Sequence, residues 1–203
     1  MDRYRARFAS SQREVLAAQA LRYQCFNLLN KVELDVDDFD TICQHVLIEN
    51  LETNKLICCY RILNFENGKN ISSSYSAQFY DLKSIESYSK PMIEVGRFCI
   101  DPEVNDPSVV LTAWAALAQI VAQSRTELLF GCSSFEGIDK RKYVDSFALL
   151  RERYIAPVHW RPRIKSAKVF CYSKDLKCKV DKKKALINMP PLLKTYLSMG
   201  AWV

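Results

Sequence analysis

Two neighbouring apolar runs in this chain are predicted to be β-strands. Residues 44–50 and residues 56–65 are apolar and rich in β-branched and aromatic side chains, a composition that favours strands. A short polar loop around Thr53 and Asn54 joins them. Two strands joined by so short a loop are predicted to pair as an antiparallel hairpin.

A third stretch, residues 91–102, reads PMIEVGRFCIDP and alternates like a half-buried strand. It carries an acid and an arginine inside this alternation. The two faces expected from the alternation are Ile93, Val95, Arg97 and Cys99 on one side and Glu94, Gly96, Phe98 and Ile100 on the other. A charge inside an apolar strand must be paired or must face a cleft, since an unpaired buried charge is costly. Gly96 indicates a bulge or a close backbone approach. A structural ion pair and a functional pair both remain open at this point.

Helical periodicity predicts four helices. The first opens at a capping box, SQRE at Ser11–Glu14. The second starts at Asp106 as N-cap, with Pro107 in its first turn; it runs to about Gln123, is apolar nearly all round and is expected to be buried. The other two are expected at residues 142–155 and 190–199, and further strands at residues 127–135 and 168–172.

The order of these elements predicts the fold class. Antiparallel strands come first and a strand, a helix and a further strand follow, which argues for an α/β (α+β) protein with a mixed sheet and helices packed on it. A chain of 203 residues is most simply one domain, so residues 1–203 are expected to form a single domain.

Positive charge is concentrated near the carboxyl end. Residues 161–184 contain ten Lys or Arg and two Asp, a net of +8, whereas the whole chain carries +6. Such a basic segment suits an acidic protein, an anionic lipid or a nucleic acid. A solvated, flexible lysine-rich loop is the simpler alternative, and the sequence leaves both open.

Several function classes have no support in the residues. The eight cysteines lack CxxC spacing and the two histidines, His45 and His159, lie far apart, so neither a metal site nor a disulfide framework is expected. No glycine-rich nucleotide motif, HExxH or GxSxG occurs. The amino terminus lacks the apolar run of a signal peptide. A cytoplasmic protein, or one that docks on the inner face of a membrane, is expected.

A set of motifs follows one another along the chain: Arg22, Phe26, DDFD at Asp37–Asp40, YR at Tyr60 and Arg61, EVGRFCIDP at Glu94–Pro102, LFGCSSF at Leu129–Phe135 and PPLLKTYLSMGA at Pro190–Ala201. Taken in this order, they resemble the bacterial ornithine N-acyltransferases, which share a GNAT-like fold with the acyl-homoserine-lactone synthases. The resemblance extends from about residue 5 to the end. The resemblance implies a GNAT-like mixed sheet with helices on both faces. It also implies transfer of a (3-hydroxy)fatty acyl group from acyl carrier protein to the α-amine of L-ornithine, giving lyso-ornithine lipid.

The residues can be matched to that reaction as hypotheses. Glu94 is the expected general base, and N–H groups freed by a bulge at Gly96 are expected to face the developing oxyanion. Guanidinium groups fit the carboxylate of the amino acid. The expected substrate contacts are Arg22, Arg61 and Arg97 for that carboxylate, Asp37 and Asp40 for the ornithine ammonium, and Phe26 as an aromatic wall beside Arg22.

The donor side follows from the same resemblance. No cofactor is expected to be bound, because the acyl group would arrive on the 4'-phosphopantetheine of acyl carrier protein. Asp106 stands where acetyl-coenzyme A enzymes of this fold present bare helix N–H groups to a pyrophosphate. Acyl carrier proteins are acidic, so the basic segment is the expected dock, with anionic membrane as a second use. The docking residues named for it are Arg161, Arg163, Lys165 and Lys168.

Alternatives to this function remain. An acyl-homoserine-lactone synthase or an N-acyltransferase for another amino acid would use the same scaffold, and a non-catalytic module that binds acyl carrier protein or membrane would need only the basic segment. The family continues for some tens of residues beyond the point where this sequence stops, so a shortened carboxyl terminus is expected. Nucleic acid is not an expected partner.

Overall fold

In the computed structural model, which describes residues 3–27, 33–176 and 180–203, the chain forms two units. The first, called unit 1, contains residues 1–70 and 88–131. The second, called unit 2, contains residues 71–87 and 132–203. The expectation of one domain over residues 1–203 stays a prediction.

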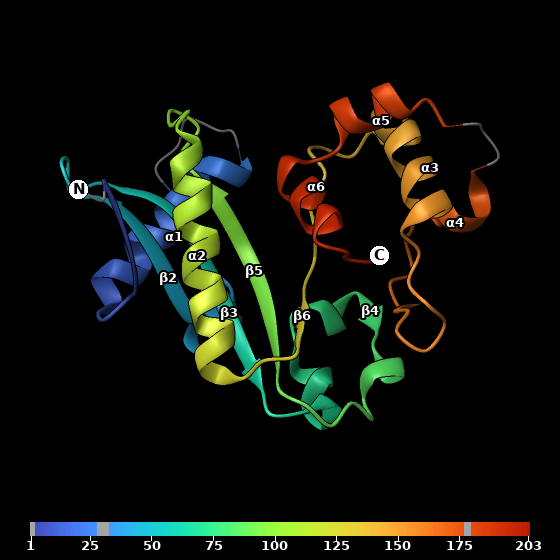
Figure 1. The fold of residues 1–203 in the computed structure, drawn as a ribbon, viewed down its shortest axis with the longest axis horizontal. Helices are drawn as coiled ribbons and strands as arrows, with labels where there is room; N and C mark the ends of the chain where they lie inside the picture. Colours follow the sequence, from blue (N-terminus) through green and yellow to red (C-terminus); the bar gives the residue numbers. More distant parts are fainter. Residues whose placement is uncertain (1–2, 28–32, 177–179) are drawn as a thin grey trace. The chain divides into compact units, whose positions relative to one another are not determined.

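Unit 1 is built on a five-stranded mixed sheet with the order β1-β2-β3-β5-β6 (Figure 1). The first three pairings, β1 with β2, β2 with β3 and β3 with β5, are antiparallel, and β5 pairs with β6 in parallel. A parallel pair requires a crossover, and α2 supplies it. The strands are β1 (Tyr4–Phe8), β2 (Gln44–Asn50), β3 (Leu56–Phe65), β5 (Met92–Ile100) and β6 (Leu128–Phe130). The predicted hairpin and the predicted mixed sheet are confirmed.

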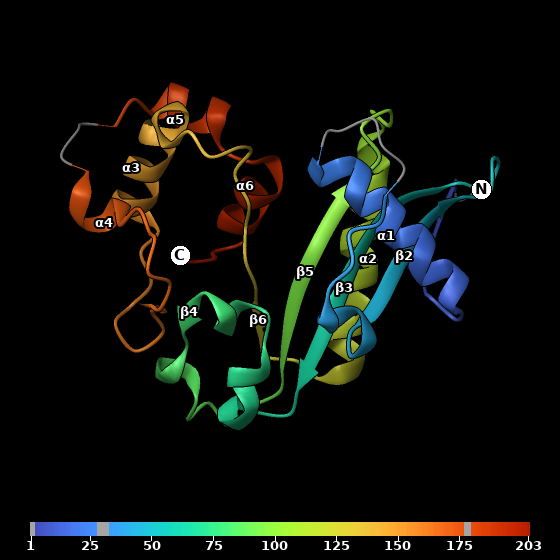
Figure 2. The ribbon, with the colours of Figure 1, turned by 180° about the vertical axis from the view of Figure 1, so that it is seen from behind.

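Helices cover both faces of this sheet. Figure 1 shows α2 (Pro107–Ser124) in front of the strands, and Figure 2, from behind, shows α1 (Gln12–Asn27) on the opposite face. Val109, Ala113 and Leu117 of α2 are buried against one face, and Ala18 and Leu21 of α1 pack against the other.

Only one stripe of α2 is buried, so the expectation that this helix is buried all round is wrong. Leu111 is 68% exposed on its outer side. The sheet reaches one stripe of the helix, and its many alanines made the sequence look apolar on every side. Within the described part of the chain, α2 is the one helix long and apolar enough to cross a membrane by length and composition, which alone is weak evidence.

Strand β5 carries the predicted bulge. Opposite β3, Cys59 pairs with Cys99 and Arg61 pairs with Gly96, so β5 uses one residue more than β3 over this interval. Arg97 absorbs the extra residue with a φ of 53°, in the left-handed region. A one-residue shift reverses which face the side chains point to.

The bulge therefore overturns the two faces expected for residues 91–102. Before it, Ile93 and Val95 pack in the core on the α2 side. After it, Cys99 packs on the α1 side and Phe98 lies against the α2 core. Simple alternation had placed Val95 and Cys99 on the same face.

Beyond Glu94 the partner strand β6 ends. The pairs are Met92 with Leu128, Ile93 with Leu129 and Glu94 with Phe130, and β5 then continues to Ile100. At the point of parting, a Cβ on Gly131 would lie 2.2 Å from the carbonyl oxygen of Val95. Only glycine allows the two backbones to approach this closely.

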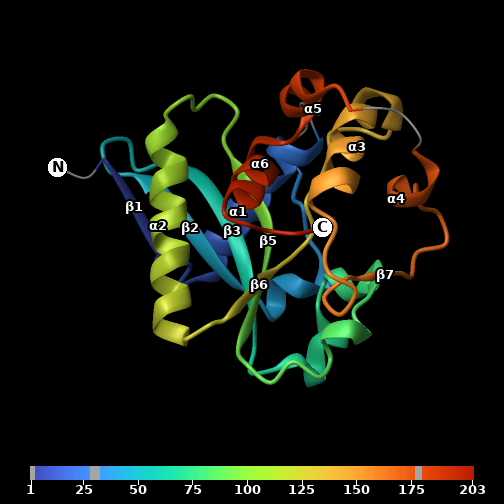
Figure 3. The same cartoon turned by 45° about the vertical axis from the view of Figure 1, so that its right-hand side comes forward.

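Unit 2 is mainly helical (Figure 3). Its core joins Leu149 and Leu150 of α3 to Ala185, Met189 and Leu193. A two-stranded antiparallel sheet pairs β4 with β7. The elements are β4 (Tyr80–Asp81), α3 (Val144–Arg153), β7 (Arg163–Ile164), α4 (Tyr172–Asp175), α5 (Lys182–Asn188) and α6 (Pro191–Ser198).

Two predicted strands differ from the structure. Residues 168–172 form no strand, and the chain enters α4 at Tyr172. The strand expected over residues 127–135 is only Leu128–Phe130, because it ends where Gly131 meets β5. The strand β1 and the helix α5 were not predicted.

Candidate functional site

A single 3₁₀ turn presents two aspartates to the α1 face of the sheet. This turn, η1 (Asp38–Thr41), is closed by a reciprocal capping box. The Asp37 carboxylate accepts from Phe39 N at 3.0 Å, and the Asp40 carboxylate accepts from Asp37 N at 3.2 Å. The capping box therefore holds both carboxylates on the same short turn.

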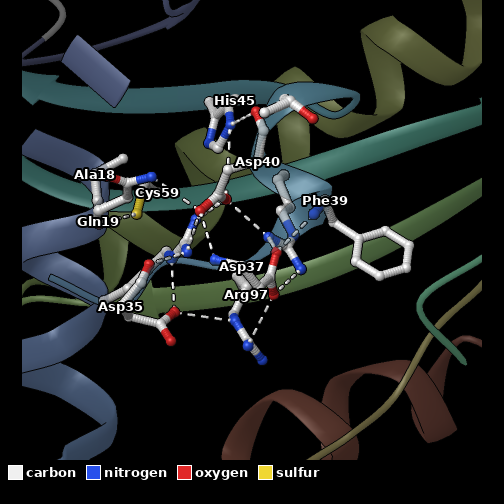
Figure 4. A network of polar contacts seen from close by, with 12 residues as sticks. Ala18, Gln19, Asp35, Asp37, Phe39, Asp40, His45, Cys59 and Arg97 are labelled. Carbon is white, nitrogen blue, oxygen red and sulfur yellow. Dashed lines mark hydrogen bonds and ion pairs between the residues drawn. The ribbon is translucent and has the colours of Figure 1, made fainter. Parts of the chain in front are cut away.

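Asp40 is the centre of a buried polar network (Figure 4). Its carboxylate accepts from Arg22 at 2.6 and 3.0 Å, from Arg61 at 2.7 Å and from Gln19 Nε2 at 2.9 Å. The Asp40 side chain is 5% exposed, that of Arg22 1% and that of Arg61 3%. Two guanidinium groups from different elements, α1 and β3, thus meet on one carboxylate.

The outer end of the network is partly open to solvent. Asp37 accepts from Arg61 Nη1 at 2.6 Å and Nη2 at 2.7 Å, in a bidentate pair. Arg97 Nη2 donates to Asp37 at 3.1 Å, and Arg97 Nε lies 3.0 Å from the Asp35 carboxylate. Asp35 in turn accepts from Arg22 Nε at 2.8 Å. Arg97, Asp37 and Asp35 are 24%, 23% and 19% exposed.

The charges of this network balance. Three arginines, Arg22, Arg61 and Arg97, face three aspartates, so no net charge is buried. Burial raises the pKa of the Asp40 carboxyl, but hydrogen bonds from Arg22 and Gln19 outweigh it and hold that pKa well below its usual range. The pKa of Asp37 is lowered in the same way, with burial opposed by Arg61. Both aspartates therefore stay ionised at neutral pH.

His45 contacts the backbone of the turn that carries Asp40 (Figure 4). Its side chain is 4% exposed and its Nε2 lies 3.1 Å from the backbone oxygen of Asp40. Burial lowers the pKa of His45 and outweighs the opposite effect of Asp40. A neutral imidazole at this place holds the η1 turn without adding a charge.

Glu94 lies at the last paired position before β5 and β6 part. It is 4% exposed, and its alternation with Ile93 and Val95 points its side chain to the α1 face, the face of the network. Burial raises the pKa of the nearby Cys43 thiol to about 11, and Glu94 adds to this rise. The buried carboxyl group of Glu94 thus stands within electrostatic range of Cys43, at the place where β5 and β6 part.

The arginine that lies beside the Phe26 ring is Arg97, not Arg22 as expected from the sequence. The guanidinium carbon of Arg97 lies 6.0 Å from the centre of the Phe26 ring, within the range of a cation–π contact. Phe26 is 43% exposed, whereas Arg22 is turned inward onto Asp40. Gly96 lies beneath Arg61, whose Nε is 4.0 Å from the position of a Cβ there. Of the predicted residues, the structure thus brings Arg22, Phe26, Asp37, Asp40, Arg61 and Arg97 together around one point of unit 1.

The basic residues named for docking lie in unit 2. Arg163 is on the short strand β7, and Lys168 is exposed. Arg161 Nε and Nη2 both donate to the carbonyl oxygen of Ala156, at 2.9 and 2.7 Å. Lys165 Nζ donates to the carbonyl oxygen of Ala77. Two of the four side chains are therefore held by the backbone of their own unit while they remain exposed.

Sequence reasoning missed three members of the network. Asp35 belongs to the same acidic run as Asp37 and Asp40, and that run was the signal that could have included it. Gln19 and His45 gave no such signal, because each contacts Asp40 through the fold alone. In the described ranges, no group of three or more His, Cys, Asp or Glu side chains could hold a metal ion.

Comparison with known proteins supports the fold and the resemblance. Residues 21–115 match the family model described as acetyltransferase (GNAT) domain. The chain is 29% identical to an L-ornithine N(alpha)-acyltransferase of Rhodobacter capsulatus, over 98% of this chain and 82% of that protein. It is also 29% identical to an L-ornithine N(alpha)-acyltransferase of Brucella abortus, over 97% of this chain and 76% of that protein. The predicted GNAT-like fold and the predicted resemblance are confirmed.

Solved structures give a more distant likeness. The AHL synthase LasI aligns with a TM-score of 0.46 at 19% identity, over 63% of this chain and 71% of that one. An N-acyl amino acid synthase from uncultured soil microbes, FeeM, also aligns with a TM-score of 0.46, at 17% identity, over 63% of this chain and 70% of that one. Nothing about function follows from likenesses at this level.

Proposed function

We propose that this chain, a GNAT-fold protein similar over nearly its whole length to L-ornithine N(alpha)-acyltransferases, is itself an N-acyltransferase that acylates the α-amine of L-ornithine. The single observation that carries the proposal is this near full-length similarity, which spans both units. The product is an N-acylornithine, and with a 3-hydroxyacyl donor it is lyso-ornithine lipid.

The chemical step is the attack of an amine on a thioester. Glu94 first takes one proton from the ornithine ammonium, directly or through a water, and passes it to solvent, because it is the buried carboxyl group where β5 and β6 part. The neutral nitrogen then forms a bond to the carbonyl carbon, the carbon–sulfur bond breaks, and the second proton that the nitrogen loses on becoming an amide ends on the departing thiolate. The bulge at Gly96 and Arg97 supplies backbone N–H groups for the developing oxyanion.

The open end of the polar network binds the acceptor. Arg97 is the partly exposed arginine and receives the ornithine carboxylate, while Asp37 receives the side-chain ammonium. Arg22, Arg61 and Asp40 are buried, and they act as positioning residues that hold the two exposed groups. From the sequence, the three arginines and the two aspartates were all expected to contact ornithine; in this proposal only Arg97 and Asp37 do.

The donor is an acyl group on acyl carrier protein. The N-terminus of α2 offers no bare site for a pyrophosphate, because the Asp106 carboxylate accepts from Ser108 N at 2.9 Å and from Tyr4 Oη at 2.6 Å. These bonds, led by that from Tyr4, lower the pKa of Asp106 to about 2, so the position is negative at neutral pH. A donor carried on protein with one phosphopantetheine phosphate fits this end better than coenzyme A.

The basic segment receives the acidic carrier protein. Arg161, Arg163, Lys165 and Lys168 are exposed, and the backbone contacts of Arg161 and Lys165 reduce the side-chain entropy lost on docking. Opposite charges of this kind raise the association rate and set specificity.

The experiment is an assay of the purified chain by mass spectrometry. The donor is 3-hydroxyacyl-acyl carrier protein, and the acceptors offered in parallel are ornithine, other amino acids and S-adenosylmethionine. N-acylornithine is the expected product. A lactone from S-adenosylmethionine, or an acylated amino acid other than ornithine, would replace the proposed acceptor, and no product with any acceptor would contradict the enzymatic assignment.

A further inference from the structure

Helix α5 packs one side into the core of unit 2. Ala185 is fully buried, and Met189, just past the helix end, is 2% exposed. Ser146 Oγ of α3 donates to the carbonyl oxygen of Ala185 at 2.8 Å. These contacts fix the rotation of α5 about its own axis.

The opposite side of α5 mixes lysines with exposed aliphatic side chains. At 3.6 residues per turn, Lys183 and Ile187 point away from the buried side of Ala185, and Lys184 and Leu186 lie on its two flanks, all four of them exposed. Leu186 is 50% exposed and Ile187 67% exposed. One exposed aliphatic side chain is common, but here two adjacent ones lie within one turn of the lysines, and we call these four residues the α5 face.

Positive charge surrounds the α5 face. Lys182 precedes it, and Lys194 Nζ donates to the carbonyl oxygen of Leu186 at 3.1 Å, which brings a further ammonium to its end. Two acidic residues stand at the start of the helix. Asp181 is the N-cap that accepts from the N–H groups of Lys183 and Lys184, and its carboxylate also lies 3.7 Å from Lys184 Nζ. The Asp145 carboxylate accepts from Asp181 N at 3.1 Å. Unit 2 as a whole carries 17 Lys or Arg against 8 Asp or Glu, a net of +9, while unit 1 carries 12 against 15, a net of −3.

We propose that the α5 face docks on the surface of an anionic lipid bilayer, with Leu186 and Ile187 in the headgroup region and the lysines on the lipid phosphates. Charge complementarity selects this occupant, because lysines beside protruding aliphatic side chains match a surface that is anionic outside and apolar just beneath. The inference rests on the proposed function in one respect: a fatty acyl product leaves water for a bilayer, so an enzyme held there releases it where it is stable.

The size of the effect follows from the two contributions. Each lysine near an anionic surface strengthens binding about fivefold at moderate salt. Withdrawing two aliphatic side chains from the headgroup region should weaken binding roughly tenfold or more. The loss of binding caused by removing the lysines can therefore be measured separately from the loss caused by removing the aliphatic side chains.

The test is a flotation or sedimentation assay of the full chain with vesicles. One set of vesicles is phosphatidylcholine alone and the other contains phosphatidylglycerol in equal part. The variants are Leu186→Gln with Ile187→Gln, which leaves the net charge unchanged, and Lys183→Gln with Lys184→Gln. The matched control is Leu111→Gln on α2 of unit 1, since Leu111 is 68% exposed, as Ile187 is 67%.

The wild-type chain is expected to bind the vesicles that contain phosphatidylglycerol and not to bind those of phosphatidylcholine alone. Both double variants should bind less tightly by the factors given, and Leu111→Gln should bind like the wild type. Equal binding by the wild type and the Leu186→Gln, Ile187→Gln variant would overturn the proposal, as would an equal loss in Leu111→Gln, which would move the surface to α2.

Two further measurements separate this proposal from others. If the double variants bind vesicles normally but lose affinity for acyl carrier protein, the α5 face is a protein dock and the lipid proposal is wrong. Acylation of ornithine is assayed in vesicle-free buffer, so an inactive chain that binds anionic vesicles would contradict the proposed function alone. An active chain that ignores anionic vesicles would contradict the docking alone.

Discussion

Replacement of Asp40 by asparagine tests the structural core of the site. Asp40 accepts hydrogen bonds from Arg22, Arg61 and Gln19, and the two arginines are 1% and 3% exposed. In Asp40→Asn the negative charge disappears while the shape stays, so one of the three arginines of the network loses its balancing charge. Removing one partner of a buried ion pair typically costs about 3–5 kcal/mol. We expect a loss of about 3 kcal/mol or more from the free energy of unfolding of unit 1.

The assay is native-state hydrogen exchange of the β3 and β5 amides, because it reports unit 1 even if unit 2 unfolds separately. Asp38→Asn is the matched control, since Asp38 stands in the same η1 turn with an exposed side chain. The control should change the free energy by less than about 0.5 kcal/mol. A loss below about 1 kcal/mol in Asp40→Asn would refute the argument that the charge of this carboxylate, shared between two buried arginines, is needed to balance the network.

The same variant carries a pH signature. The pKa of Asp40 is lowered in the folded protein, so its stabilisation is fully present above the unfolded-state pKa of aspartate, about 4. It is lost as pH falls further toward the folded-state pKa. The wild type should therefore lose stability below about pH 4 more steeply than Asp40→Asn, and parallel pH profiles would contradict the assignment.

Three further predictions concern other features of the chain. Gly131→Ala should lower the free energy of unfolding of unit 1 by about 3 kcal/mol or more, because the new Cβ would lie 2.2 Å from Val95 O. Gly96→Ala should change it by less than about 1 kcal/mol, because the nearest atom to its new Cβ is 4.0 Å away. Similar hydrogen-exchange results for the two variants would contradict the close approach of Gly131 to β5. The buried, neutral His45 has a lowered pKa, so stability should fall as pH drops below about 6.5, and His45→Gln should flatten that part of a urea-unfolding series. Salt should raise the Michaelis constant for acyl carrier protein donor but not for an acyl-pantetheine donor, since screening acts on the protein dock; a constant value for both would argue against the basic segment as the dock.

The sequence predicted best the elements whose pattern is local. The hairpin of β2 and β3 matched its expected bounds because apolar runs, β-rich composition and a short loop agree there. Helix α2 was also bounded closely, since Asp106 and Pro107 form a clear start. A bulge was one of the two possibilities predicted from Gly96, but its effect on side-chain direction was not predicted, because the extra residue is accommodated at Arg97.

The features that could not be predicted depend on contacts between residues far apart in the sequence. Strand β1 reads YRARF, a clean alternation in which Arg7 pairs with Glu49 and Glu14, yet five residues at a charged terminus carry a weak signal. Charge neutralisation across α1, η1, β3 and β5 could not be derived from spacing either. Residue types indicated that Arg22, Arg61 and the aspartates belonged to one site, but only the fold shows which of them are buried and which face solvent.

The most direct test of the proposed reaction compares the wild type with Glu94→Gln in the mass-spectrometric assay with 3-hydroxyacyl-acyl carrier protein and ornithine. Glutamine keeps the shape of this buried side chain and cannot take the ammonium proton. We expect N-acylornithine from the wild type and a rate lower by about 10²-fold or more from the folded variant, with the deficit shrinking as pH rises and more ornithine amine is already neutral. A folded Glu94→Gln protein with the full acylation rate would contradict the assignment of Glu94 as the base, and a wild type that forms no N-acylornithine would contradict the function itself.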